Sequence, residues 1–261
     1  MMNNQMYYIH PNAKIGKNVT IEPFAVIYDD VEIGDDCWIG PHVTIFPGAR
    51  IGKNCKIFPS ASIAAVPQDL KFEGEYTTAE IGDNNIIREF VTINRGTNAS
   101  KRTVIGNNNL IMAYAHVAHD CIIGDNCILA NSATLAGHVE VDDYAIIGGQ
   151  SAVHQFCRIG KHVILMGGSL VDKDIPPYVK GGKFPVSYCG INSVGLSRRG
   201  YSTETINNIQ NIYRVVFQKG LTYTNALAEI KQLPQSPEGN EIISFMEKAE
   251  RGLMKGFTSV R

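Results

Sequence analysis

The chain has 261 residues, which is room for one large domain or two smaller ones. Its formal net charge is −1 with 19% charged residues, so we expect no nucleic-acid binding and no general affinity for polyanions. No apolar run approaches the ~20 residues of a transmembrane helix, and residues 1–10 lack the apolar core of a signal peptide, so we expect a cytoplasmic protein without a transmembrane segment.

A large aliphatic residue recurs at every sixth position from Ile9 to Val171, and only Asp69, Glu75 and Ala99 break this register. A period of six fits neither an amphipathic helix nor a long alternating strand. It is typical of a hexapeptide β-helix, in which each coil has three short sides and one aliphatic per side fills the axis. Resemblance to hexapeptide-repeat families implies a left-handed coil. The sequence therefore predicts an all-β left-handed parallel β-helix.

Small residues form a second inward register, four positions after the aliphatics. Most of the cysteines occupy it, so we interpret them as core packing rather than as disulfides or zinc ligands: Cys37, Cys55, Cys121, Cys127 and Cys157. Glycine directly follows the aliphatic in many coils, as at Gly34 and Gly106. We expect these glycines to form tight corners that need a permissive backbone.

Two polar stretches interrupt the repeat, near residues 64–80 and 95–104. Both contain turn formers, so we expect them to project as loops from one side of the solenoid. The pair Pro176-Pro177 then stops the repeat. We expect the β-helix domain to span residues 1–190 and a C-terminal α-helical domain to span 191–261.

The C-terminal part of the chain follows a helical pattern after an irregular connector over residues 178–200. Ser202 is placed to cap a helix over 203–219, and a shorter helix is expected over 224–232. Ser236-Pro237 opens a third helix that is expected to close near Gly252. We expect this segment to cover the last coil, because an open coil end is a template for aggregation.

Histidines gather on the outside of the predicted solenoid, since none of the seven falls in an inward register. His116, His119, His138 and His154 should therefore lie on the outer surface or in a groove between subunits. Three sides of six residues make a coil of 18, and this spacing places His119 beside Gly137 and Asp120 beside His138.

This grouping suits acyl transfer. An imidazole takes a hydroxyl proton near neutral pH, a glycine lets a carbonyl approach a backbone N–H that stabilises an oxyanion, and a carboxylate orients the ring. No serine or cysteine is placed as an obvious nucleophile. Direct attack by the substrate hydroxyl is therefore favoured over a covalent intermediate.

Several longer segments resemble the signature sequences of bacterial UDP-N-acetylglucosamine O-acyltransferases. They are PQDLK (67–71), IREFVTINRGT (87–97), HVAHDC (116–121), LAGHV (135–139), AVHQFCRIG (152–160) and LSRRGY (196–201). The resemblance covers nearly the whole chain. It implies the first step of lipid A biosynthesis, in which acyl carrier protein delivers a (3R)-hydroxyacyl chain to the glucosamine 3-OH of UDP-N-acetylglucosamine, without a cofactor or metal. It also implies a homotrimer with active sites between subunits.

The resemblance also implies roles for individual residues. His119 would be the general base, Asp120 its orienting partner and Gly137 the oxyanion donor. The residues implied in substrate binding are Asp69, Lys71, His116, His138, His154, Gln155, Asn192, Arg198 and Arg199, and a guanidinium fork suits the phosphates. Gly167 matches the position that sets acyl-chain length, where a glycine implies room for a longer chain; a plain turn glycine is the alternative.

Two positions depart from the family pattern. Asn94 stands where the family often has histidine, and it can hydrogen-bond but cannot carry charge. Val194 stands where an acidic residue is common before the arginine pair. Neither residue touches the expected base.

Other interpretations remain open at this point. A γ-class carbonic anhydrase shares the fold, and His116, His119 and His138 could hold its zinc. The related N-acyltransferase would need an extra N-terminal domain, for which the repeat leaves no room. Acyl length, a 3-amino analogue as acceptor, and the site where carrier protein docks are not fixed by the sequence; the basic candidates for docking are Arg158, Lys161, Lys173, Lys180 and Lys183.

Overall fold

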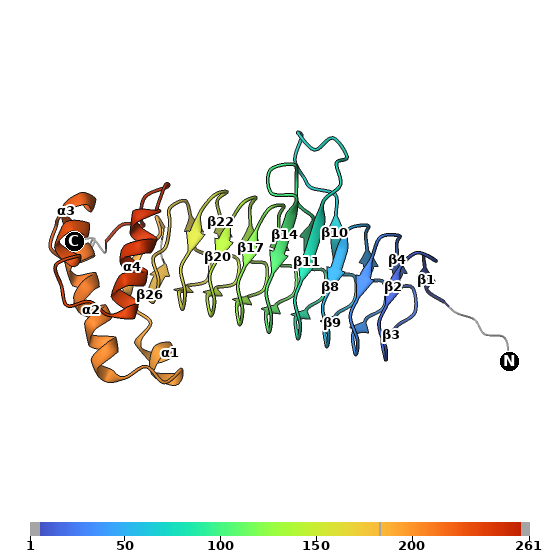
Figure 1. Cartoon of the computed structure of the whole chain (residues 1–261), viewed down its shortest axis with the longest axis horizontal. Helices are drawn as coiled ribbons and strands as arrows, with labels where there is room; N and C mark the ends of the chain where they lie inside the picture. The colour runs from blue at the N-terminus through green and yellow to red at the C-terminus, as the bar shows by residue number, and fades with distance from the viewer. Residues whose placement is uncertain (1–5, 183, 257–261) are drawn as a thin grey trace.

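The protein is an elongated three-sided prism closed at one end by helices (Figure 1). The computed structural model describes residues 6–182 and 184–256. Three sheets run the length of the prism, all of them parallel except for the last strand of the third, and the chain visits them in turn. The predicted left-handed parallel β-helix followed by a helical segment is confirmed.

Each sheet forms one face of the prism. The first face comprises β1 (Tyr8–Ile9), β4 (Val26–Ile27), β7 (Thr44–Ile45), β10 (Ser62–Ala65), β13 (Thr92–Asn94), β16 (His116–Val117), β19 (Thr134–Leu135), β22 (Ala152–Val153) and β25 (Leu170–Val171). The second face comprises β2 (Lys14–Ile15), β5 (Glu32–Ile33), β8 (Ala49–Ile51), β11 (Thr78–Ile81), β14 (Arg102–Ile105), β17 (Ile122–Ile123), β20 (Glu140–Val141) and β23 (Arg158–Ile159).

The third face begins with β3 (Thr20–Ile21) and ends at the helices. Its other strands are β6 (Trp38–Ile39), β9 (Lys56–Ile57), β12 (Ile86–Ile87), β15 (Leu110–Ile111), β18 (Ile128–Leu129), β21 (Ile146–Ile147), β24 (Ile164–Leu165), β26 (Val179–Gly182) and β27 (Ser187–Ile191). We call the corner between the first and second faces the first edge, that between the second and third faces the second edge, and the remaining corner the third edge.

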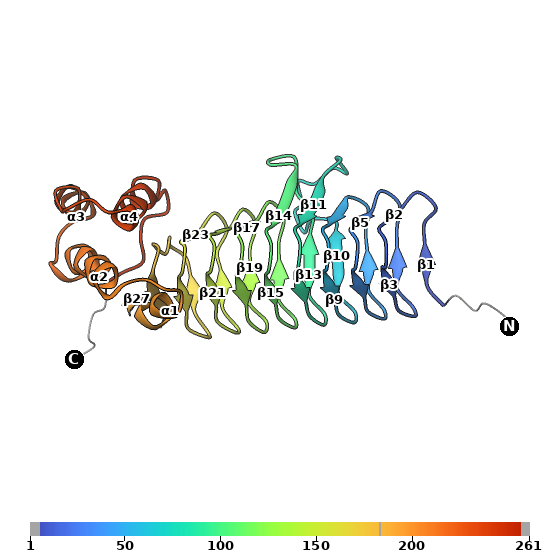
Figure 2. The ribbon, with the colours of Figure 1, turned by 60° about the horizontal axis from the view of Figure 1, so that its bottom comes forward.

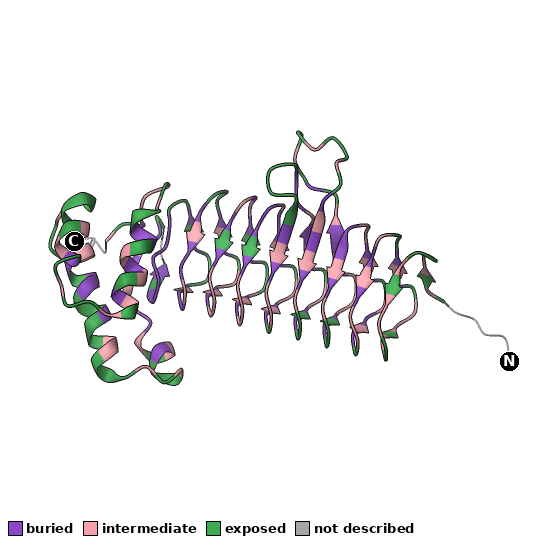
Figure 3. Ribbon diagram, in the orientation of Figure 1, coloured by how far each residue is buried: buried purple, intermediate pink, exposed green. Residues whose placement is uncertain are grey.

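The aliphatic register fills the axis of the prism. Ile9 pairs with Ile27, so one undisturbed coil is 18 residues long. From Ile27 to Val171 every aliphatic in this register is at most 5% exposed. In most of the short strands this buried residue follows one that is partly or fully exposed (Figure 3). Five of the cysteines are buried in the second register and all six are free, which confirms their packing role.

The corners have a left-handed backbone, but the glycines do not provide it. A positive φ recurs three residues after the aliphatic, on non-glycine residues such as Asp120 (59°) and His138 (61°), where it costs roughly 1–2 kcal/mol each. The expectation for Gly34 and Gly106 was therefore wrong. A Cβ on Gly34 would lie 2.7 Å from the backbone of Gly52 in the next coil, and one on Gly106 would lie 2.7 Å from the carbonyl of Gly124. Glycine is required there for close approach between coils.

Both insertions leave the prism at the first edge and lie side by side (Figure 2). Each is shorter than expected, because the ends of the interrupting stretches extend the strands: Ser62–Ala65 and Thr78–Ile81 flank the first, and Thr92–Asn94 and Arg102–Ile105 the second. We call residues 66–77 the first insertion loop and residues 95–101 the second insertion loop. Neighbouring strands pair across both gaps, so the loops add to the coils without disturbing the core.

The connector after Pro177 is more ordered than expected. β26 continues the third face in parallel with β24, and β27 returns antiparallel to it. A short helix α1 (Ser193–Arg198) follows, with Asn192 as its N-cap. The expectation of an irregular connector was therefore wrong. The segment has no hexapeptide pattern, but main-chain hydrogen bonds to the last coil order it as strands.

Three helices cover the end of the solenoid, as expected. They are α2 (Thr203–Gln218), α3 (Tyr223–Ile230) and α4 (Pro237–Glu247). Tyr213 and Phe217 of α2 pack on Tyr188 of β27. α4 ends before the expected Gly252, because Gly252 and Met254 instead make main-chain hydrogen bonds with Asp174. Across the described residues, no helix is long and apolar enough to cross a membrane.

Candidate active site

The predicted catalytic residues lie on consecutive coils at the first edge. His119 and Asp120 follow β16, and Gly137 and His138 follow β19. The backbone N–H of His138 donates to the carbonyl of His119 at 3.1 Å. The pairing of neighbours expected from the coil length is thus confirmed.

His119 lies against the backbone of Gly137. A Cβ on Gly137 would be 2.5 Å from Cε1 and 2.7 Å from Nε2 of His119, so only glycine admits the ring in this position. The Gly137 N–H has no hydrogen-bond partner among the described residues. A free donor therefore lies beside the imidazole.

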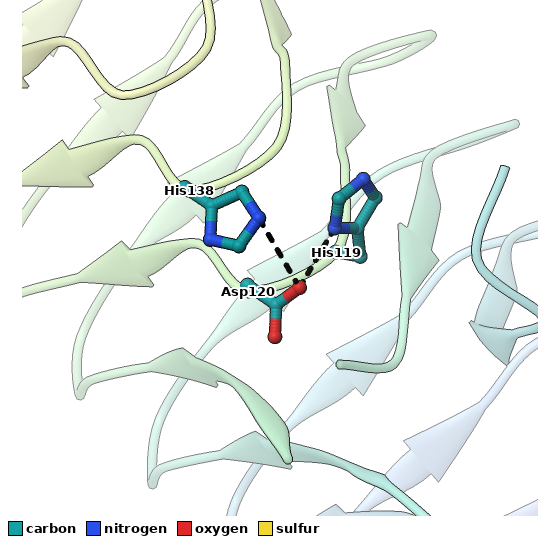
Figure 4. A group of neighbouring side chains, drawn as sticks. All are labelled: His119, Asp120 and His138. Atoms are coloured by element: carbon teal, nitrogen blue, oxygen red, sulfur yellow. Dashed lines mark hydrogen bonds and ion pairs between the residues drawn. The ribbon is translucent and has the colours of Figure 1, made fainter. Parts of the chain in front are cut away.

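Asp120 holds the other side of the His119 ring (Figure 4). Nδ1 of His119 is 2.7 Å from Oδ2 of Asp120, whereas Nε2 of His138 is 3.7 Å from the same oxygen. Because the carboxylate accepts a hydrogen bond from Nδ1–H, the proton of the neutral ring is on Nδ1 and Nε2 of His119 keeps a free lone pair. Asp120 therefore pairs with His119, and His138 lies just outside hydrogen-bond distance.

Donors from the second insertion loop surround the Asp120 carboxylate. Thr97 donates from its N–H to Oδ1 at 3.0 Å and from its hydroxyl to Oδ2 at 2.6 Å. Ser100 donates from its N–H at 3.2 Å and also from its hydroxyl, both to Oδ1. Burial alone would raise the pKa of Asp120, but hydrogen bonds from Ser100, Thr97 and His119 outweigh it and lower the pKa to about 2. Asp120 is therefore ionised near neutral pH.

His138 forms the far wall of the site. Its ring stacks on Phe156, with centroids 4.6 Å apart, and meets the His119 ring edge to face. Burial lowers the pKa of His138, and the charge of His119 acts in the same direction, while Asp120 and Asp69 oppose them. His138 is thus favoured in its neutral form.

His116 lies on the outward side of β16, one step before the first edge. Its Nδ1 is 2.7 Å from the hydroxyl of Thr92, and burial lowers its pKa. His154 and Gln155 lie at the same edge one coil beyond Gly137, where both are exposed. The structure therefore gathers these predicted contacts along one edge.

The first insertion loop brings Asp69 and Lys71 to this edge. Oδ1 of Asp69 accepts the backbone N–H of Lys71 at 3.0 Å, and Asp69 is close enough to act on the charge of His138. Asn94, one of the departures from the family pattern, is buried and donates to the carbonyl of Val66 at 3.1 Å. Asn94 therefore braces the base of the loop.

A cavity of about 600 Å³ opens beside the site, along the second face. Asp120, His138 and Phe156 line one end, and Lys248 and Glu250 line the other. The cavity thus runs from the histidines to the C-terminal segment.

Arg158, a candidate for carrier docking, lines the middle of this cavity but is engaged within the chain. It donates to Glu140 at 3.1 Å, lies 4.5 Å from the ring centre of Phe245, and reaches the carbonyl of Lys248 at 3.4 Å. Another candidate, Lys183, lies outside the described residues. Arg158 therefore ties α4 to the second face.

Three other predicted residues lie on the second edge of the same chain. Arg198 and Arg199 end α1, and the Arg199 guanidinium lies 5.1 Å from the ring centre of Tyr144 at that edge. Asn192 is buried, donates to the carbonyl of His162 at 2.9 Å and accepts the N–H of Gly195. One chain therefore does not bring these residues to His119, and their contact with substrate stays a prediction.

Gly167 lies on the third edge. A Cβ there would be 3.2 Å from the carbonyl of Gly149 in the previous coil, and the neighbouring Met166 is 52% exposed. Val194, the other departure, is 63% exposed on α1. The glycine has a packing reason in addition to its predicted role in acyl length.

Three residues that touch the candidate site had no predicted role: Thr97, Ser100 and Phe156. The sequence signal for them was weak, because Thr97 and Ser100 are hydroxyl residues in a polar insertion and Phe156 is an aromatic residue one coil after His138. These positions become informative only when the coils are stacked.

The site does not fit a three-histidine zinc centre. His119, Asp120 and His138 offer atoms within 4.8 Å of one another, but His116 is not part of this group and bonds Thr92. The oxygens of Asp120 already accept hydrogen bonds from Thr97, Ser100 and His119. The donor set therefore lacks the third histidine and a free carboxylate lone pair.

Comparisons with known proteins agree with the fold and the site. A family model for the bacterial transferase hexapeptide, of six repeats, matches residues 12–47 and 102–137. A second model, for domain 2 of UDP-N-acetylglucosamine O-acyltransferase, matches residues 174–254.

Individual relatives match over almost the whole chain. An acyl-[acyl-carrier-protein]–UDP-N-acetylglucosamine O-acyltransferase from Thiobacillus denitrificans is 43% identical over 249 residues, covering 95% of this chain and 96% of that protein. The protein of the same name from Alkalilimnicola ehrlichii is 45% identical with the same coverage. The crystal structure of a UDP-N-acetylglucosamine acyltransferase from Bacteroides fragilis is 51% identical, with a TM-score of 0.94 over 97% of this chain and 100% of that one.

Proposed function

The chain belongs to the family of acyl-[acyl-carrier-protein]–UDP-N-acetylglucosamine O-acyltransferases, and from this premise we propose that His119 acts as its general base. The reaction is transfer of an acyl chain from acyl carrier protein to UDP-N-acetylglucosamine, in lipid A biosynthesis. We propose the glucosamine 3-OH as acceptor and a (3R)-hydroxyacyl chain as the transferred group. The observation that carries the mechanism is the position of His119 between the Asp120 carboxylate and the Gly137 backbone.

Nε2 of His119 is the proposed proton acceptor in the first step. Asp120 accepts a hydrogen bond from Nδ1–H, which leaves the Nε2 lone pair to take the proton of the sugar hydroxyl. The hydroxyl oxygen attacks the thioester carbonyl as this proton leaves, so no acyl-enzyme forms. Asp120 stays ionised throughout and stabilises the imidazolium.

The oxyanion of the tetrahedral intermediate is proposed to accept a hydrogen bond from the free N–H of Gly137. Collapse of the intermediate breaks the carbon–sulfur bond, and the thiolate of the carrier's prosthetic group takes the proton from Nε2 of His119. The base is thereby restored. The reaction needs no cofactor and no metal, since the acyl carrier protein is itself the donor substrate.

The sugar nucleotide is proposed to contact residues along the first edge. Asp69 and Lys71 on the first insertion loop, and His116, His138, His154 and Gln155 on the coils, line this edge. Arg198 and Arg199 would bind the phosphates, with Asn192 supporting α1 beneath them. Gly167 would set the room available for the acyl chain.

We infer that these groups meet between subunits of a homotrimer. His119 lies on the first edge and Arg199 on the second, so a site that uses both needs a second chain. The outward positions of the third face also hold aliphatic residues on consecutive coils, where a solvated sheet would carry polar ones: Ile86, Leu110, Ile128, Ile146 and Ile164. We propose that this stripe faces the other subunits.

A cytoplasmic location is proposed on the basis of the cysteines. All six are free, as is usual in a reducing compartment. The carbonic anhydrase alternative is not favoured, because the relatives are acyltransferases and the donor set lacks a third histidine.

The test is an acyl-transfer assay with UDP-N-acetylglucosamine and carrier-bound 3-hydroxyacyl chains of graded length. We expect a 3-O-acylated product, and a fall in kcat of ~10²–10⁴-fold in His119→Gln with little change in KM. His42→Gln is the matched control, because His42 lies on the third edge and stacks on Phe24. An inactive wild-type protein would refute the function; full activity in His119→Gln would refute only the base. A parallel assay with the 3-amino analogue defines the acceptor.

A further inference from the structure

The second insertion loop has no role in the mechanism above, yet it supplies most of the donors to Asp120. Five donors lie within hydrogen-bond distance of the carboxylate: the N–H and hydroxyl of Thr97, the N–H and hydroxyl of Ser100, and Nδ1 of His119. The Ser100 hydroxyl also lies 2.8 Å from the carbonyl of Arg102, so its one proton is shared between two acceptors. A carboxylate has about four lone-pair sites. The acceptor capacity of Asp120 is therefore fully used, and four of its five donors come from a loop outside the hexapeptide repeat.

We propose that Thr97 and Ser100 are positioning residues, which clamp the Asp120 carboxylate so that it orients His119 and does not pair with His138. This inference rests on the proposed role of His119 as the base. Neither Thr97 nor Ser100 is proposed to touch substrate. Both act through Asp120.

The geometry shows what the clamp prevents. Oδ2 of Asp120 lies 2.7 Å from Nδ1 of His119, and Nε2 of His138 is only 1 Å farther away, at 3.7 Å. A small rotation of the carboxylate would exchange one histidine for the other. The Thr97 hydroxyl, 2.6 Å from the same Oδ2, fixes the rotation, and the N–H groups of Thr97 and Ser100 hold Oδ1.

The loop that carries the clamp is itself fixed. Within it, the N–H of Lys101 donates to the carbonyl of Thr97 at 2.8 Å. The N–H of Gly96 donates to the carbonyl of Thr78 at 3.0 Å, and the N–H of Asn98 to the carboxylate of Glu75 at 2.8 Å. The second insertion loop therefore also joins the first, which carries Asp69 and Lys71.

Loss of the clamp has a distinct electrostatic consequence. Asp120 is almost fully buried, and burial by itself raises the pKa of a carboxyl group. The titratable groups that face Asp120 are His119 and His138, and the described residues place no lysine or arginine within 4.0 Å of it. Without the hydroxyl donors, Asp120 would take up a proton at a pH where the wild-type carboxylate stays ionised.

The experiment compares Thr97→Val, Ser100→Ala and the double variant with wild type in the acyl-transfer assay. We expect kcat to fall ~10-fold in each single variant and ~10²-fold in the double variant, with little change in KM. Thr97→Ser keeps the hydroxyl that Thr97→Val removes, so it should retain most of the wild-type rate. Asn98→Ala is the matched control, because its side chain lies on the same loop and bonds Lys101 rather than Asp120.

The pH profile separates positioning from general damage. In wild type, log(kcat/KM) should rise with a slope of about one on the acid side, because Asp120 stays ionised there and only the general base has to be unprotonated. In the double variant Asp120 also titrates, so the slope should rise toward two. A lower profile with an unchanged slope would overturn the inference, since damage to the fold alone predicts that result.

Histidine ¹⁵N NMR gives a readout that does not depend on turnover. Wild type should show a neutral His119 with its proton on Nδ1, assigned by its absence in His119→Gln, and the double variant should lose this preference. Unchanged His119 signals in the double variant would overturn the clamp. If instead wild type transfers no acyl group while NMR shows the clamped tautomer, the proposed function fails and the clamp stands.

Discussion

The imidazole of His119 occupies the space that a side chain on Gly137 would fill, since a Cβ there would lie 2.5 Å from Cε1. Gly137→Ala should therefore displace the ring and lower kcat by ~10²-fold. In a His119→Ala background the same substitution should add little, because the clash is gone. Steady-state kinetics on the four proteins measures this coupling. Additive losses would show that Gly137 acts independently of the ring.

Asp120 makes stability depend on pH. Its pKa is lowered from 3.8 to about 2 in the folded protein, so the stabilisation is present above pH ~4 and is lost as pH falls toward 2. The difference in unfolding free energy between wild type and Asp120→Asn should be about 2 kcal/mol near pH 7 and shrink below pH 4. Urea unfolding of both proteins across this range measures it. A difference that is constant with pH would contradict the assigned hydrogen bonds.

The sequence predicted the parts of the fold that repeat. The register from Ile9 to Val171 located the core, and the coil length alone placed His119 beside Gly137 and Asp120 beside His138. Contacts between segments without a repeat left no such pattern. Asp174 pairs with Leu253 through main-chain hydrogen bonds to Gly252 and Met254, and this tertiary pairing, invisible in a local helical pattern, ends α4 early.

The site was predicted least well where it leaves the coils. The hydroxyls of Thr97 and Ser100 reach Asp120 only because the second insertion loop folds back over the next coil, and no periodicity sets that path. The glycines show a different limit. Gly34 was recognised as special, but the sequence could not show that contact with Gly52, and not a positive φ, makes it so.

Asn192 supports the arginine pair rather than standing free beside it. Asn192→Ala removes the N-cap of α1 and the bond to the carbonyl of His162, so we expect a loss of roughly 1–2 kcal/mol in stability. KM for UDP-N-acetylglucosamine should also rise, because Arg198 and Arg199 lose their position. Arg198→Ala should raise KM without the loss in stability. An unchanged KM in Asn192→Ala would separate α1 from nucleotide binding.

The aliphatic stripe on the third face predicts the quaternary structure. Ile128→Lys places a charge at its centre, so we expect dissociation to monomers and loss of acyl transfer, since the site needs two chains. Val104→Lys on the second face is the control, because that face carries ion pairs such as Lys14–Glu32 and Arg102–Glu80. Sedimentation analysis distinguishes the two. A trimeric, active Ile128→Lys protein would exclude the third face as the interface.

The lengths of the two insertion loops determine which insertions and deletions the β-helix can accept without a shift in its core register. Ile63 pairs with Ile93 and Ile93 with Val117, so each loop lengthens its coil by a whole number of hexapeptides. Excising residues 66–77 would join Ala65 to Thr78 in the regular register and leave an ordinary coil. The loops that carry Asp69, Lys71 and the Asp120 clamp are therefore additions to a scaffold whose core is complete without them, and insertions or deletions of six residues or a multiple of six keep that core in register.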